Sequence, residues 1–122
     1  MSHTYPARLR FRAECEYDVD VLKEALARKG IESRLSEIPK QKAQGPVWEF
    51  EAANNQDAIQ LLRALMGVED GHRMLQTLDV ADHYDGEAFS DNEARTTRVA
   101  ALLAPESKQD QFVVNRYQEL FS

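Results

Sequence analysis

The sequence predicts an α+β domain in which helices cover one face of an antiparallel sheet. Two segments, residues 7–15 and 47–52, alternate apolar and polar side chains, as strands with one buried face do. A stretch with apolar residues at helical spacing follows the first segment and another follows the second. The order of strand, helix, strand, strand and helix matches most of a ferredoxin-like fold. We therefore expect a ferredoxin-like βαββα core followed by C-terminal helices.

The first predicted strand, ARLRFRAEC at residues 7–15, has two faces of different character. Arginines dominate one face, and the face expected to be buried carries Leu9, Phe11, Ala13 and Cys15. A helix is predicted over the next segment, YDVDVLKEALARKG. Asp18 is expected to cap its first turn and Gly30 to end its last turn.

Two further strands are predicted, IESRLSEI at residues 31–38 and VWEFEA at residues 47–52. The segment between them, PKQKAQGP, has the composition of a turn. A second helix follows, capped by Asn54 or Asn55. Its apolar residues repeat at helical spacing and are Ala58, Ile59, Leu62 and Leu65.

The sheet face away from the helices is expected to be a ladder of charges. Arg10 or Arg12 would pair with Glu49 or Glu51 across the strands. The aromatic residues of these strands lie on the opposite, buried face. The sequence therefore predicts no exposed aromatic platform on which RNA bases could stack.

The segment HRMLQTLDV, residues 72–80, fits a strand and a short helix about equally well. A strand here would complete the ferredoxin-like sheet. A helix here would leave the edge of the first strand open. A homodimer formed by pairing of sheet edges therefore stays one possible assembly.

The last third of the chain predicts two helices. Residues 90–93, Ser-Asp-Asn-Glu, form a capping box, so the first helix is expected to begin near Asp91. Pro105 interrupts it. The second helix is expected from about Gln109 to Leu120, with one apolar side made of Val113, Tyr117, Leu120 and Phe121. The length fits a single domain, residues 1–122, with a core at 7–66, an acidic connecting segment at 67–93 and helices at 91–121.

The net charge of −6 is unevenly distributed. Residues 79–93 contain no Lys or Arg and carry Asp79, Asp82, Asp85, Glu87, Asp91 and Glu93. Such a segment argues against binding a nucleic-acid backbone, which requires cations. The apolar runs are far shorter than the roughly 20 residues that span a bilayer, so no membrane association is expected. A single cysteine, Cys15, fits a reducing cytoplasm.

The acidic segment lacks the spacing of a metal site. With Gly86 at the glycine position of a calcium loop, two ligand positions and the final Glu are wrong. His72 and His83 do not have the helical spacing of a zinc site. No nucleophile, phosphate-loop or metalloprotease motif is present. We therefore predict no metal, no cofactor and no catalytic residue, which favours a non-enzymatic role and leaves an enzyme as an open alternative.

The leading hypothesis is that the chain binds, and inhibits or regulates, a protein with a basic surface. Acidic groups steer such encounters and aromatic groups anchor them. The predicted contact residues are Asp79, Asp82, Tyr84, Asp85, Glu87 and Phe89. Small immunity proteins, antitoxins and phage inhibitors are often built this way. The alternative is a small-ligand binder or an enzyme, with His72 or His83 beside a carboxylate in a pocket.

The segment HYDGEAF, residues 83–89, resembles the end of the ferredoxin-like domain in bacterial regulators of ribonuclease activity of the B type. Tyr84, Asp85 and Gly86 match that family's Tyr-Asp-Gly-aromatic motif, and Glu87 stands where the aromatic residue belongs. The resemblance implies an inhibitor that binds a ribonuclease. The family's long acidic tail is absent, and two predicted helices take its place.

Overall fold

The computed structural model describes residues 5–13, 15–38, 46–68, 71–85 and 92–121. Within them the chain forms four strands, five α-helices and two short 3-10 helices. The strands are β1 (Ala7–Arg12), β2 (Leu35–Ile38), β3 (Val47–Ala52) and β4 (Asp79–Val80). The helices are α1 (Glu16–Ala27), α2 (Asn55–Gly67), α3 (Gly71–Leu75), α4 (Asn92–Leu103) and α5 (Lys108–Leu120), and the 3-10 helices are η1 (Glu32–Arg34) and η2 (Ala81–His83).

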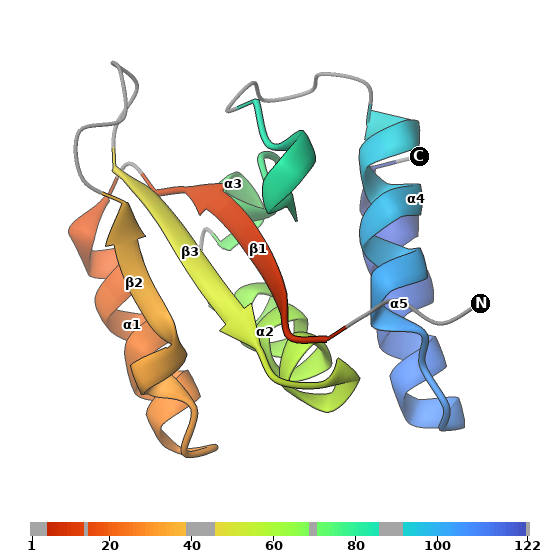
Figure 1. Cartoon of the computed structure of the whole chain (residues 1–122), viewed down its shortest axis with the longest axis horizontal. Helices are drawn as coiled ribbons and strands as arrows, with labels where there is room; N and C mark the ends of the chain where they lie inside the picture. The colour runs from red at the N-terminus through yellow and green to blue at the C-terminus, as the bar shows by residue number, and fades with distance from the viewer. Residues whose placement is uncertain (1–4, 14, 39–45, 69–70, 86–91, 122) are drawn as a thin grey trace.

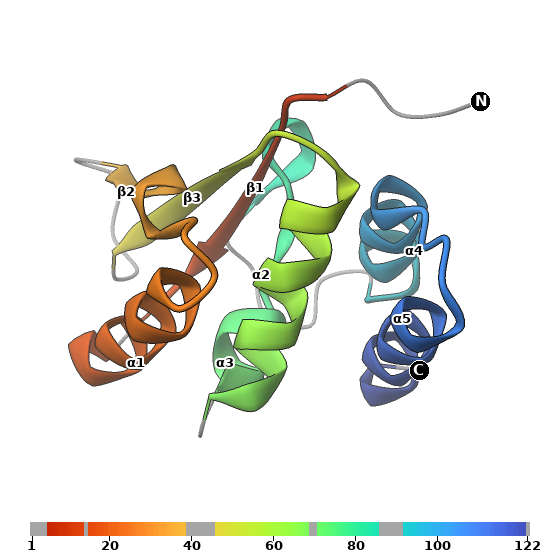
Figure 2. The ribbon, with the colours of Figure 1, turned by 90° about the horizontal axis from the view of Figure 1, so that it is seen from below.

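The four strands form one antiparallel sheet in the order β2-β3-β1-β4. Helices α1 and α2 cover one face of it (Figures 1 and 2), which gives the α+β architecture that the sequence predicts. Helices α4 and α5 lie beside α2, beyond the β4 edge of the sheet (Figure 2). The described helices are all too short or too polar to cross a membrane.

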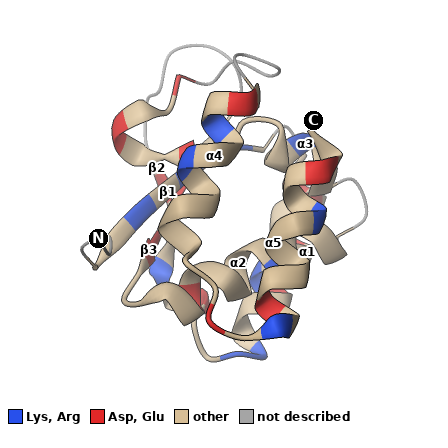
Figure 3. Ribbon diagram, turned by 90° about the vertical axis from the view of Figure 1, so that its right-hand side faces the viewer, with Lys and Arg blue, Asp and Glu red and all other residues tan. Residues whose placement is uncertain are grey.

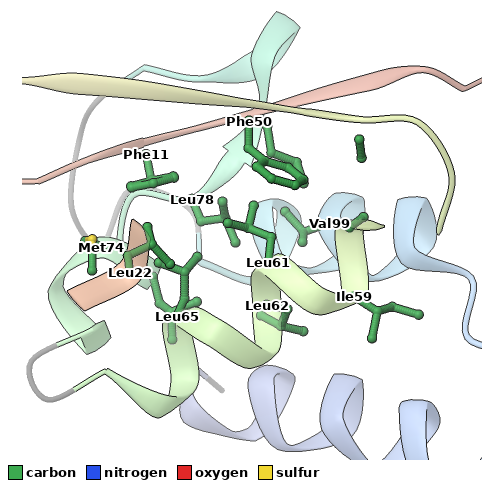
Figure 4. Close-up of a cluster of buried hydrophobic side chains, with 14 of the residues drawn as sticks. Phe11, Leu22, Phe50, Ile59, Leu61, Leu62, Leu65, Met74, Leu78 and Val99 are labelled. Atoms are coloured by element: carbon green, nitrogen blue, oxygen red, sulfur yellow. The ribbon is translucent and has the colours of Figure 1, made fainter. Parts of the chain in front are cut away.

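The core lies between the sheet and α2. Phe11 and Phe50 project from the sheet and are completely buried. They face the apolar side of α2, where Leu61, Leu62 and Leu65 are also buried (Figure 4). Because α2 contacts β3 on one side and α4 and α5 on the other, it is buried over a wider arc than a helix with one solvent-facing side. This explains why Leu61 is buried in addition to the predicted stripe.

The start of α1 differs from the prediction. β1 ends at Arg12, and Cys15, predicted on the buried face, is exposed and occupies the N-cap position. Asp18 is not the cap but a buried residue of the first turn. The helix ends at Ala27 and a turn carries the chain to Gly30, whose φ of 74° is the left-handed conformation that favours glycine.

The next elements agree better with the sequence. The predicted strand at 31–38 is part 3-10 helix, since η1 precedes β2, which begins only at Leu35. β3 has the predicted bounds. Asn54 is the N-cap of α2, and its side chain accepts a hydrogen bond from the backbone N–H of Asp57 at 3.0 Å. This cap satisfies one of the unpaired donors in the first turn.

Residues 72–80 contain both of the structures that their sequence allows. The short helix α3 comes first and the two-residue strand β4 follows. β4 pairs with Leu9 and Arg10. Further along β1, the hydroxyl of the buried Thr77 accepts a hydrogen bond from the backbone N–H of Arg12 at 2.8 Å. The edge of β1 is therefore covered, and β2 has no further strand beyond it among the described residues.

The two C-terminal helices are present, with changes in detail. The predicted capping residues Ser90 and Asp91 lie outside the described residues. The cap of α5 is Ser107, whose hydroxyl accepts from the backbone N–H of Asp110 at 3.0 Å. On α5, Val114 rather than Val113 is buried beside Tyr117. Leu120, predicted on the apolar side, is exposed.

Candidate functional site at the edge of the sheet

The acidic residues 79–93 begin at the edge of the sheet. The first two of them form β4, and the chain then turns through η2, which contacts β1. Residues 81–85 continue past the sheet. We call them the docking segment because the leading hypothesis places contact residues there. Of the predicted contact residues, Glu87 and Phe89 lie outside the described residues, and the other four have different environments.

Asp79 is a structural residue. It is 3% exposed, although its position in the acidic segment suggested a solvated side chain. Its carboxylate accepts two hydrogen bonds from the Arg98 guanidinium of α4, at 3.2 Å from Nε and 2.7 Å from Nη2. Its Oδ1 atom also accepts from the backbone N–H of Val80 at 2.8 Å. A buried carboxylate with these partners cannot present its charge to another protein, so we remove Asp79 from the contact set.

Asp82 and Asp85 have the expected exposure, as does His83 between them. Asp82 and His83 belong to the single turn of η2, and Asp85 follows it. The three acidic residues Asp79, Asp82 and Asp85 do not share an α-helical face, because the chain is a strand and then a 3-10 turn here. The exposed Asp82 and Asp85 therefore closely follow β4, which the Asp79–Arg98 ion pair joins to α4.

Tyr84 is half-buried, and its hydroxyl has no hydrogen-bond partner among the described residues. Burial raises the pKa of the phenol above its usual value, and the nearby charge of Asp85 adds to this shift. The positive charges of Arg12 and Arg10 oppose it. The half-buried Tyr84 is therefore close enough to Arg10 and Arg12 of β1 to feel their charges.

The arginines of β1 are partly neutralised within the sheet. Arg10 lies directly opposite Glu49 on β3, and its Nε atom donates to Glu49 Oε1 at 2.8 Å, as one of the predicted pairings requires. Arg8 approaches the same oxygen only to 3.9 Å. The expected charge ladder is present at this position. Of these two arginines, Arg8 is therefore less closely paired with a carboxylate than Arg10.

A hollow of about 580 Å³ lies between the docking segment and α4. We call it the edge hollow. Residues from the start of β1, from β4 and η2, and from the second half of α4 line it. Figure 3 shows this side of the molecule, with Lys or Arg positions on β1 and α4. Both Asp82 and His83 border the hollow, and both are exposed.

The other candidate histidine has a different environment. His72 is exposed on α3 and stacks on the Phe121 ring, with centroids 5.4 Å apart. It does not line the edge hollow. Among the described residues, no three His, Cys, Asp or Glu side chains come together as a metal site requires.

Two arginines of α4 are important here and were not singled out from the sequence. Arg98 holds Asp79, and Arg95 is 3% exposed. Nη1 of Arg95 donates to the carbonyl oxygens of Leu75 and Leu78, both at 2.9 Å. Arg95 precedes Val99 by four residues and Leu102 by seven, so its spacing within the apolar stripe was a signal for burial.

Comparison with protein-family models, with curated proteins and with solved structures finds no match for this chain. The resemblance of HYDGEAF to the regulators of ribonuclease activity therefore rests on the sequence motif alone.

Proposed function

We propose that this chain is a non-catalytic cytoplasmic protein that binds a protein with a basic surface and inhibits or regulates it. The docking segment would make the contact through Asp82, Tyr84 and Asp85. Glu87 and Phe89, which follow in sequence, complete the proposed contact set. One observation carries the proposal: two exposed carboxylates follow a buried ion pair that fastens the segment to α4.

The physical argument concerns preorganisation. A loop that must be ordered on binding loses conformational entropy, and this loss weakens the complex. The Asp79–Arg98 ion pair and the partial burial of Tyr84 restrain the start of the docking segment before any partner arrives. Exposed acids on such a base attract a basic surface from a distance, mainly by raising the association rate. Tyr84 would supply the apolar contact.

We also propose that the scaffold is a ferredoxin-like βαββαβ unit. The alternation of strands and helices through α2 supports it, as does the position of β4 next to β1. The short α3 before β4 and the pair α4 and α5 after it would be additions to that unit. β2 would be the edge available to a second copy in a homodimer.

Capture from a lysate of the native host tests the proposal. The tagged chain is incubated with lysate at low and at high salt, and the bound proteins are identified by mass spectrometry. We expect one stoichiometric partner with a basic surface that is lost as salt rises, because exposed charges are screened. A captured ribonuclease would favour the inhibitor function that the resemblance implies.

Two charge-reversed variants make the experiment specific. Asp82→Lys combined with Asp85→Lys should abolish capture. Glu32→Lys combined with Glu106→Lys changes the net charge equally at exposed positions outside the docking segment and should retain capture. Equal loss in both variants would mean that only total charge matters. Unchanged capture in the first variant would refute docking through this segment.

A further inference from the structure

Two contacts join the elements that line the edge hollow. The hydroxyl of Tyr5, just before β1, donates to the carbonyl oxygen of Leu102 on α4 at 2.7 Å. Arg98 of α4 forms an ion pair with Asp79 of β4. These contacts fix the β1–β4 wall relative to α4 without any ligand. A volume of about 580 Å³ is within the usual range for small-molecule sites.

The inner lining of the edge hollow is largely apolar. It includes Ala7 and Val80 from the sheet and Ala101 and Leu102 from α4. Leu102 is 4% exposed, and Ala7 and Val80 are partly buried. A short aliphatic group placed here would exclude water from these side chains, which favours binding.

The charged side chains around this lining differ in how closely each is paired with a group of opposite charge. Arg98 is neutralised by Asp79 through two hydrogen bonds. Arg8 is half-exposed, and the carboxylate nearest to it already accepts from Arg10 at 2.8 Å while lying 3.9 Å from Arg8. Asp82 is exposed and forms no ion pair with the described residues. With respect to the described residues, the hollow therefore presents one weakly paired cation, Arg8 on β1, and one anion without an ion-pair partner, Asp82 on η2.

We propose that the edge hollow binds a small amphipathic zwitterion, a molecule with one anionic group, one cationic group and a short aliphatic body. Arg8 would bind the anionic group and Asp82 the cationic group. A singly charged ligand satisfies only one of them and is repelled by the other. This site shares Asp82 with the docking segment, whereas Arg8 lies outside that segment, so variants of Arg8 distinguish the two proposals.

Four probes with the same number of carbon atoms test the proposal. They are 6-aminohexanoate and norleucine, which are zwitterions, and hexanoate and hexylammonium, which carry one charge each. Binding is followed by changes in backbone amide shifts of the ¹⁵N-labelled full chain. We expect at least one zwitterion to bind saturably and to shift the amides of Arg8, Val80–His83 and Ala101. Its affinity should exceed that of both singly charged probes by roughly threefold, the size expected for one additional exposed charge pair.

Two variants should change the preference in opposite directions. Arg8→Gln leaves Asp82 as the uncompensated charge, so hexylammonium should now bind better than hexanoate. Asp82→Asn leaves Arg8, so hexanoate should now bind better than hexylammonium. Arg28→Gln and Glu106→Gln remove exposed charges outside the hollow and should preserve the zwitterion preference.

Several results would overturn the proposal. These are the absence of saturable binding of either zwitterion, shifts located outside the hollow, or the same preference in Arg8→Gln and Asp82→Asn. Thermal midpoints of the variants establish that each is folded. Arg8→Gln should retain partner capture, so failure of this proposal and failure of the docking proposal give different results.

Discussion

Arg98 of α4 binds Asp79 of β4 through both carboxylate oxygens, with N–O distances of 3.2 and 2.7 Å. The two side chains differ in exposure, 33% for Arg98 and 5% for Asp79. Removing Arg98 therefore leaves a buried carboxylate, whereas removing the charge of Asp79 leaves a guanidinium that still reaches water. The pair joins the last strand of the sheet to the C-terminal helices.

This asymmetry predicts unequal losses of stability. Asp79→Asn should lower the free energy of unfolding by about 2 kcal/mol and Arg98→Met by about 3–4 kcal/mol. The double variant should lose less than the sum, because each single variant leaves its partner uncompensated. Urea denaturation of the four proteins measures the coupling. Additive losses would mean that the pair contributes no specific interaction.

The glycines at the end of α2 and the start of α3 should respond to alanine in opposite directions. A Cβ atom on Gly71 would overlap the carbonyl oxygen of Leu65 and crowd Val68, so Gly71→Ala requires a backbone shift. A Cβ atom on Gly67 meets nothing within 4 Å. We expect Gly71→Ala to destabilise by about 2 kcal/mol or more and Gly67→Ala to stabilise by about 0.5 kcal/mol. Thermal unfolding of both variants distinguishes them, and equal effects would contradict the packing described around α3.

The hydrogen bonds of Asp110 lead us to expect that the stability of the fold decreases at acidic pH. Its carboxylate accepts from Arg63 at 3.0 Å and from Gln56 at 3.3 Å, both on α2. The hydrogen bond from Arg63 is the main cause that lowers the pKa of Asp110 below its usual value. A carboxyl with a lowered folded-state pKa stabilises the protein above the unfolded value, about 3.9, and loses this contribution as pH falls through the folded value.

We expect Asp110→Asn to lower the stability at pH 7 by roughly 1 kcal/mol, since Arg63 is partly solvated. The difference from the wild-type protein should shrink as pH falls below about 4. Urea denaturation between pH 7 and pH 3 measures it. A difference that stays constant over this range would exclude the proposed role of the charge.

The burial of Tyr117 leads us to expect that the stability of the fold decreases at alkaline pH. It is completely buried, and its hydroxyl meets no hydrogen-bond partner among the described residues. Burial is the main cause that raises its pKa, Asp79 adds to the shift, and Arg95 opposes it. A raised folded-state pKa stabilises the protein below the unfolded value, about 10, and this contribution is lost as pH rises towards the folded value.

Tyr117→Phe should therefore change stability little at pH 7 and lose less stability than the wild-type protein between about pH 10 and pH 11. Tyr17→Phe is the matched control, because Tyr17 is 67% exposed. Urea denaturation at a series of pH values compares the three proteins. A Tyr117 variant as sensitive to alkali as the wild type would contradict this account.

Local patterns predicted the elements that depend on local physics. β1 alternates because one of its faces meets water and the other meets the core. β3 follows the same pattern from Glu49 to Ala52, but at its start Val47 is buried and Trp48 only partly buried. The cap at Asn54 and the turn at Gly30 also follow from short-range chemistry. β4 was ambiguous because two residues are too few to show a period. Its pairing with β1 depends on strand geometry about 70 residues apart in sequence, which no local pattern contains.

The site was less predictable because Asp79, one of its charged side chains, pairs with a residue far away in the sequence. Asp79 resembles its acidic neighbours in sequence, and only the approach of α4 makes it a buried ion pair. Asp82 and Asp85 are exposed as expected. Cys15 was misplaced for a similar reason, since the strand period cannot show that β1 ends at Arg12. The edge hollow requires four elements, β1, β4, η2 and α4, to come together and has no sequence signature.

The most direct test of the docking function is the dissociation constant of the captured partner, measured against salt for three forms of the chain. They are the wild type, Asp82→Lys with Asp85→Lys, and Glu32→Lys with Glu106→Lys. The account predicts that wild-type affinity falls as salt rises, that the docking variant is at least about tenfold weaker at low salt, and that the control stays within about twofold of the wild type. Equal weakening of both variants, or no weakening of the docking variant, would contradict it.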